Sequence, residues 1–309
     1  MPDPSAKHPI VRWLRWALGG FVALGVGVAF WRLVQRWDGR EVQLRWQPIL
    51  VSLVVLLIAN VFQALGWLRL LERMSGKTLG IRPVLTVFML SQMARYAPGK
   101  VGVPMVRIAA STRMGVQPQT VAASVGIEVG SWMGLGAIMG CVALLCSNDT
   151  GPNWLQVNRV WLWLGLATLL TGIGVALLVD RNRFPPFILR MIRAEGHGPM
   201  VTLQMVWMQL ISWGGWWLLG VLMPLSVGAS LSVAMRHASI FILAPILGFL
   251  AVVAPGGLGV REAVISYALA PSLGASAALA AALLARGVAM ASELIGWLLA
   301  LYWERSAQK

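Results

Sequence analysis

Two short segments place proline, glycine and a charged residue inside otherwise apolar sequence. Residues 97–103 read APGKVGV, and residues 254–260, 157 positions later (254 against 97), read APGGLGV. Because Pro98 breaks a helix, the amides that follow it, Gly99 and Lys100 first, are left as unpaired donors at the start of the returning half-helix. A helix N-terminus with free amides favours an anion. The first segment therefore predicts a phosphate site.

Two arginines flank the first segment and would complete such a site. Arg107 follows Lys100 by seven residues and so returns to nearly the same helical face, while Arg95 precedes Lys100 by five. We predict that the three cations contact a phosphate or phosphodiester. The alternative is that they only anchor a short hairpin among the cytoplasmic lipid headgroups. The full set of predicted substrate-binding residues is Arg95, Pro98, Gly99, Lys100, Gly102, Arg107, Pro255, Gly256, Gly257, Gly259, Arg261 and Glu262.

The second segment differs from the first where chemistry would show. Gly257 stands in place of Lys100, and Arg261 and Glu262 follow side by side. We predict that this segment is a gate or counterpart, in which Arg261 is available to an anion and Glu262 restrains it. The glycines of both segments allow close backbone approach or positive φ. Alternatively, they only permit tight helix packing, as small residues do throughout membranes.

Three further ionisable residues lie within apolar spans, where charge is costly unless it is paired or functional. Glu128 and Arg286 lie about ten or eleven residues into their spans, and Glu293 follows Arg286 by seven residues on the same face. We predict that Glu128 and Arg286 form an ion pair. The pair would either fix helix docking or open and close during alternating access. Glu293 would accept the same arginine or a proton.

Composition shows which solvent surrounds these residues. The chain of 309 residues is 58% hydrophobic and 12% charged, which indicates a polytopic membrane protein. Its net charge of +14 comes from basic clusters beside the ends of apolar segments, so nucleic acid is not a predicted partner. Cys141 and Cys146 share one apolar run, and neither a disulfide framework nor a metal or cofactor site is predicted.

The chain divides into six full apolar spans and two broken regions. The spans are about 16–31, 48–70, 117–146, 160–179, 200–222 and 277–303, and the broken regions are about 83–112 and 233–271. Lysine and arginine in the short loops put the N- and C-termini in the cytoplasm and both flanks of each broken region on one side. About 14 residues on either side of Pro98 rise roughly 21 Å, short of the roughly 30 Å hydrocarbon core. The broken regions are therefore predicted to be re-entrant helical hairpins.

The same shift of 157 positions also aligns the spans that flank the two segments. It relates residues 43–146 to residues 200–303, with a linker helix at 160–179 between them, inside a single membrane domain, 1–309. One intervening span inverts the second copy relative to the first. Broken helices in matching positions of two inverted halves are typical of a transporter site near the middle of the membrane.

The residues of the two segments also carry a resemblance. Arg95-Tyr96 followed by residues 97–102, and residues 255–262, which read PGGLGVRE, resemble the two signatures of the lysylphosphatidylglycerol synthase transmembrane-domain family. The resemblance covers roughly 45–305. It implies a flippase-like protein of the bacterial inner membrane that moves aminoacylated phospholipids or polyprenyl-phosphate-linked lipids. The soluble aminoacyl-transferase domain of larger members is absent from this sequence, so only translocation is inherited.

The leading prediction is a lipid translocase for an anionic phospholipid or a polyprenyl-phosphate-linked lipid, not an enzyme. The sequence has no GxxxxGK[ST] motif, so ATP hydrolysis has no support. A second reading is a membrane partner or regulator of a lipid-linked glycosyltransferase. A third is a polyprenyl-phosphate glycosyltransferase, against which the four aspartates, all in loops or tails, form no carboxylate pair. The oligomeric state is left open.

Overall fold

The computed structural model describes residues 42–96, 102–146, 203–250 and 255–306, and every element in those ranges is helical. The predicted all-α fold is therefore confirmed. The predicted spans at 16–31 and 160–179, and the loop residues Pro98, Gly99 and Lys100, lie outside the described residues. The helices are α2 (Trp46–Ser75), α3 (Ile81–Gln92), η1 (Met93–Tyr96), α4 (Gly102–Ala109), η3 (Ser111–Met114), α5 (Pro118–Cys146), α8 (Leu203–Ser226), α9 (Leu231–Leu250), η5 (Pro255–Gly257), α10 (Val260–Leu273) and α11 (Ala275–Ser306).

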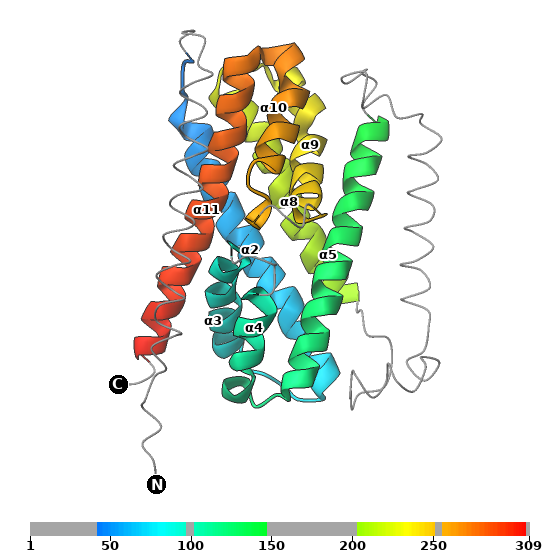
Figure 1. The fold of residues 1–309 in the computed structure, drawn as a ribbon, viewed down its shortest axis with the longest axis vertical. Helices are drawn as coiled ribbons and strands as arrows, with labels where there is room; N and C mark the ends of the chain where they lie inside the picture. Colours follow the sequence, from blue (N-terminus) through cyan, green and yellow to red (C-terminus); the bar gives the residue numbers. More distant parts are fainter. Residues whose placement is uncertain (1–41, 97–101, 147–202, 251–254, 307–309) are drawn as a thin grey trace.

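Five of the described helices are long and apolar enough to cross a membrane. They are α2, α5 over Pro118–Leu144, α8, α9 and α11. Figure 1 shows them running along the long axis of one bundle, with α11 and α5 on its two sides. The chain is thus an integral multi-pass membrane protein, while six full spans stays a prediction.

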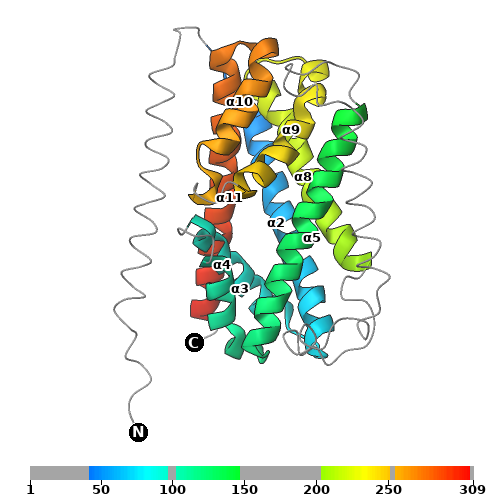
Figure 2. The same cartoon turned by 45° about the vertical axis from the view of Figure 1, so that its right-hand side comes forward.

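The two broken regions occupy opposite ends of the bundle (Figures 1 and 2). In the first, α3 has 12 residues and α4 has 8, so they rise about 18 Å and about 12 Å, too short to cross about 30 Å of hydrocarbon. In the second, α10 has 14 residues, but α9 has 20 and rises about 30 Å. The helix continues through Pro245, which removes one internal hydrogen bond without ending it. The re-entrant path of both regions stays a prediction.

Small residues let the helices approach closely. On α8, a Cβ added to Gly215 would lie 2.7 Å from Cβ of Ala59, and one added to Gly220 would lie 2.7 Å from the carbonyl oxygen of Ala238. Helices in membranes pack through such residues because no hydrophobic force drives them together. The two contacts fix α8 against α2 and α9, which form the centre of the bundle.

The inner ends of the broken regions meet beside α11. A Cβ on Gly256 of η5 would lie 2.6 Å from the ring of Tyr96 in η1, so the backbone of η5 packs directly against that ring. Helix α11 contacts α3 and η1 as well as α10. The helices that would correspond in two inverted repeats are α2 and α8, α3–α4 and α9–α10, and α5 and α11. That repeat stays a prediction.

Candidate functional site

The first buried ion pair joins α4 to α5. Nη1 of Arg107 lies 2.8 Å from Oε2 of Glu128, and each side chain is 2% exposed. Nε of Arg107 donates to Oγ of Ser91 at 3.0 Å, and Gln63 donates its amide to Oε1 of Glu128 at 3.0 Å. Both charges are therefore paired and hydrogen-bonded, as burial requires.

Aromatic rings enclose the same arginine. The guanidinium carbon of Arg107 lies 4.3 Å from the ring centroid of Trp67 and 4.5 Å from that of Phe88. Trp67 is held in turn by a 3.0 Å hydrogen bond from its indole nitrogen to Oγ of Ser124. We expected Arg107 to contact phosphate beside Lys100 and Arg95. Its guanidinium group instead binds these neighbouring residues. Contact with a phosphate would require its ion pair and hydrogen bonds within the protein to break.

The second charged group connects the first broken region to α11. Glu293 accepts hydrogen bonds from Nη1 of Arg95 at 2.7 Å and from the hydroxyl of Tyr96 at 2.7 Å. Arg95 also donates through Nη2 to Oε1 of Gln92. Glu293 thus holds the inner end of η1 against α11.

The third group connects the second broken region to the same helix. Nη1 of Arg286 donates to the carbonyl of Gly256 at 3.2 Å, and Nε lies 3.6 Å from Oε1 of Glu262. The guanidinium carbon also lies 5.2 Å from the ring centroid of Tyr96. Oε2 of Glu262 accepts the backbone amide of Gly259 at 2.7 Å, which caps the N-terminus of α10.

These last two groups form one cluster, which we call the arginine cluster: Arg95, Arg261 and Arg286 with Glu262, Glu293 and Tyr96. Arg261 packs against Gly248, and its guanidinium group interacts electrostatically with Arg95, Arg286 and Glu293. Three guanidinium groups against two carboxylates leave one positive charge in excess among these residues. Within the described chain, Nε and Nη2 of Arg286 and Nε of Arg261 are buried donors without a hydrogen-bond partner.

Glycine is required at position 256, whose carbonyl accepts the hydrogen bond from Arg286. Gly256 has φ of 57°, where side chains are strained, and any Cβ there would also collide with the ring of Tyr96. Gly257 and Gly259 have φ of 72° and 84°. In the first region, a Cβ on Gly102 would lie 2.0 Å from the carbonyl oxygen of Ala94. The glycines therefore provide both positive φ and close approach. Pro255 begins η5.

The pairing of the intramembrane charges differs from our expectation. Glu128 and Arg286 do not pair with each other: Glu128 binds Arg107, and Arg286 lies beside Glu262. Glu293 pairs with Arg95 rather than with Arg286. Position along a span gives depth in the membrane but not the direction in which a side chain points, and here the directions differ.

Sequence reasoning also missed several contributors to these groups. Tyr96 was only part of a motif, although its hydroxyl binds Glu293 and its ring contacts Arg286. Gln63, Ser91 and Gln92 were not singled out. The available signal was a polar side chain within an apolar run, which marks a partner for buried charge.

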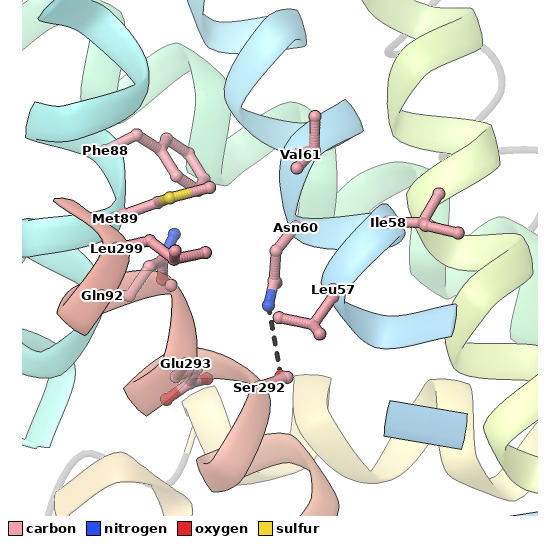
Figure 3. Close-up of a pocket in the computed structure, with 11 residues that line it drawn as sticks. Leu57, Ile58, Asn60, Val61, Phe88, Met89, Gln92, Ser292, Glu293 and Leu299 are labelled. Atoms are coloured by element: carbon pink, nitrogen blue, oxygen red, sulfur yellow. Dashed lines mark hydrogen bonds between the residues drawn. The ribbon is translucent and has the colours of Figure 1, made fainter. Parts of the chain in front are cut away.

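A pocket of about 270 Å³ lies between α2, α3 and α11 and reaches Glu293 (Figure 3). Asn60 donates across one side of it to Oγ of Ser292 at 3.2 Å. Over the described residues, no three His, Cys, Asp or Glu side chains gather to hold a metal ion. The pocket is lined by Leu57, Ile58, Asn60, Val61, Phe88, Met89, Gln92, Ser292, Glu293, Gly296 and Leu299.

Fold and site together define a multi-pass all-α membrane protein whose intramembrane charges gather where two broken helical regions meet. The family model of the lysylphosphatidylglycerol synthase TM region matches residues 15–295, so the chain belongs to this family, and this relates it to lipid handling. The comparison with curated proteins finds no match.

Proposed function

We propose that this protein is a lipid translocase of the bacterial inner membrane, with cytoplasmic termini, that moves a lipid with an anionic phosphate headgroup without hydrolysing ATP. The observation that carries the proposal is Arg286, which is buried at the meeting point of the broken regions and has two nitrogens, Nε and Nη2, with no hydrogen-bond partner among the described residues. Membership of a family related to lipid handling supports lipid as the cargo.

Charge in the arginine cluster favours a monoanion. Arg95, Arg261 and Arg286 outnumber Glu262 and Glu293 by one, and an excess charge at membrane depth is costly until a counter-ion arrives. Guanidinium groups bind phosphate oxygens through two parallel N–H donors and are more weakly hydrated than ammonium groups. A phosphodiester headgroup would neutralise the cluster and satisfy its free donors.

The two carboxylates of the cluster suit a cycle without covalent chemistry. Glu293 forms an ion pair with Arg95, and Oε1 of Glu262 lies 3.6 Å from Nε of Arg286. A phosphate would compete with both carboxylates and loosen the contacts of η1 and η5 with α11. When the phosphate leaves, the internal pairs re-form. The cluster is thereby a gate as well as a binding site, whereas the Arg107–Glu128 pair keeps α4 docked on α5.

The position of the cluster supports movement across the membrane. The first broken region lies at one end of the bundle and the second at the other (Figure 2). Their inner ends meet where Gly256 packs against the ring of Tyr96. Broken helices that enclose a site near the membrane middle are typical of alternating-access transporters. A phosphate at the cluster would be released to either side as one region or the other moves.

Mass spectrometry of copurifying lipids tests this proposal and identifies the cargo. Wild type, Arg286→Gln and the control Arg113→Gln, whose side chain is 66% exposed, would be purified in the same detergent. We expect one phosphate-bearing lipid, either a phospholipid or a polyprenyl phosphate, to be enriched in wild type and control and lost from Arg286→Gln. Only bulk lipid in all three would contradict the proposal and favour the reading as a glycosyltransferase partner.

A further inference from the structure

The pocket between α2, α3 and α11, which we call the lateral pocket, has a position and size that suit a hydrocarbon chain. Residues Leu57 to Val61 lie near the middle of α2, and both α2 and α11 are of membrane-spanning length. Its volume of about 270 Å³ is below the roughly 300–1,000 Å³ of sites for whole small molecules. A segment of one apolar chain fits such a space, and a headgroup with its chains does not.

The lateral pocket opens on the outside of the bundle and ends in its interior. Ile58 and Leu299 at the rim are 50% and 44% exposed, on faces of the two helices that meet lipid. Phe88 and Met89 of α3 form an inner wall and are 0% and 7% exposed. Figure 3 shows Phe88, Met89, Gln92 and Leu299 on one side and Asn60 and Val61 opposite. A chain from the bilayer could therefore enter sideways between α2 and α11.

The inner end of the lateral pocket adjoins the arginine cluster. Glu293 lines the pocket and binds Arg95 and Tyr96. Gln92 also lines it, and because Oε1 of Gln92 accepts from Arg95, its amide nitrogen must point elsewhere, where it has no partner among the described residues. Apolar walls next to a cationic cluster match the two parts of one amphipathic molecule.

We infer that the lateral pocket binds a hydrocarbon chain of the same lipid whose phosphate the arginine cluster binds. This inference rests on the proposed function and adds the route of entry. The lipid enters between α2 and α11 with its chain first in contact with Ile58 and Leu299, and the headgroup reaches Arg95 as the chain settles against Phe88 and Met89. Glu293, shared by both sites, yields Arg95 to the phosphate.

A pair of matched glycine substitutions on α11 separates the pocket from its surroundings. Gly296 is buried in the pocket wall, and a Cβ there would lie 3.6 Å from Cγ of Met89, an ordinary contact. Leucine at this position extends its remaining carbons into the pocket. Gly287, exposed on the same helix, would place a Cβ with nothing within 4 Å. Both Gly296→Leu and Gly287→Leu raise helix propensity, so α11 should persist in each.

Photolabelling measures occupancy directly. The full-length protein would be reconstituted in phosphatidylcholine vesicles containing a small fraction of phosphatidylglycerol with a diazirine on one acyl chain, irradiated, digested and sequenced by mass spectrometry. We expect adducts on Phe88 or Met89, which surface lipid cannot reach, in wild type and Gly287→Leu and their loss in Gly296→Leu. Adducts confined to exposed residues such as Ile58, or unchanged by Gly296→Leu, would overturn the inference.

Two further arms separate this inference from the translocase proposal. The same diazirine on phosphatidylcholine should label Phe88 and Met89 much less, and equal labelling would overturn the link between chain and phosphate sites. Translocation of labelled phosphatidylglycerol would be measured in parallel. If Arg286→Gln abolishes translocation and Gly296→Leu does not, the inferred site for the hydrocarbon chain is wrong, but the translocase proposal is supported. If wild type shows the expected adducts without translocation, the binding sites stand and the translocase fails.

Discussion

Two arginines, Arg107 and Arg286, are both buried but differ in how many of their hydrogen-bond donors the protein satisfies. Arg107 has a carboxylate at 2.8 Å, a serine hydroxyl at 3.0 Å and an aromatic ring on each of two sides. Arg286 has a carboxylate at 3.6 Å and one carbonyl at 3.2 Å, and within the described chain its Nε and Nη2 have no hydrogen-bond partner. The comparison separates an arginine used to build the fold from one with donors left for a ligand.

The largest effect should come from breaking the satisfied pair. Glu128→Ala leaves Arg107 charged, buried and without its carboxylate, which costs about 3–5 kcal/mol of unfolding free energy. Denaturant or thermal unfolding in detergent measures this, and Gln63→Ala, which removes only a neutral donor to the same carboxylate, serves as the milder reference. An unfolding midpoint that Glu128→Ala leaves unchanged would show that the pair does not hold α4 on α5.

Arg286→Gln, in contrast, should have a small effect on stability and a large effect on lipid binding. It removes one 3.2 Å hydrogen bond to Gly256 and the longer 3.6 Å contact with Glu262, but also the excess positive charge of the cluster, so we expect a net loss of about 1.5 kcal/mol in unfolding free energy. Lipid binding, in contrast, should be lost. Unfolding and copurified phosphate-bearing lipid would be measured on the same sample, with Arg286→Lys retaining the charge and part of the binding. A destabilisation as large as that of Glu128→Ala would make Arg286 a second structural arginine.

Gly256→Ala tests the contact between the broken regions. Alanine at φ of 57° costs about 1–2 kcal/mol in backbone strain, and its Cβ would also displace the ring of Tyr96. Gly115→Ala is the matched control, because Gly115 has φ of 63° and open space around it. Both should lower the unfolding free energy, but only Gly256→Ala should reduce lipid binding. Equal binding by the two variants would separate the contact from function.

The smallest effect belongs to Tyr96→Phe. It deletes one hydrogen bond to Glu293 and leaves the charges and the ring in place, so the unfolding free energy should fall by about 1 kcal/mol. Lipid binding should remain at the wild-type level. If binding falls as far as in Arg286→Gln, the hydroxyl itself contacts the lipid and the site extends beyond the arginines.

Composition and periodicity were sufficient for the class of fold, and a short duplicated phrase was sufficient to find the broken regions. Apolar runs predicted α2, α5, α8 and α11 because hydrocarbon thickness imposes their length. The sequence predicted a broken region at about 233–271, but not that its first helix, α9, has 20 residues and continues through Pro245. Local sequence gives the penalty of a proline but not the neighbouring helices that compensate for it.

The sequence predicted which residues belong to the site better than it predicted which of them pair with one another. Arg95, Arg261 and Glu262 were predicted because they lie beside the two Pro-Gly segments. Arg286 and Glu293 were predicted because charge in an apolar span needs a partner. Which partner each one has depends on how helices rotate about their axes when they pack, and Glu128 and Arg286 turn toward different neighbours. The lateral pocket was not predicted, since its walls are mostly apolar residues that come from three separate helices.

The most direct test of the central claim is translocation of fluorescent phosphatidylglycerol and of a fluorescent polyprenyl phosphate in proteoliposomes, followed by quenching of the outer leaflet. Wild type and Arg113→Gln should expose label from the inner leaflet to the quencher, and Arg286→Gln should leave it protected as in protein-free vesicles. Equal exposure with Arg286→Gln and wild type, or no exposure of either lipid with wild type, would contradict the account.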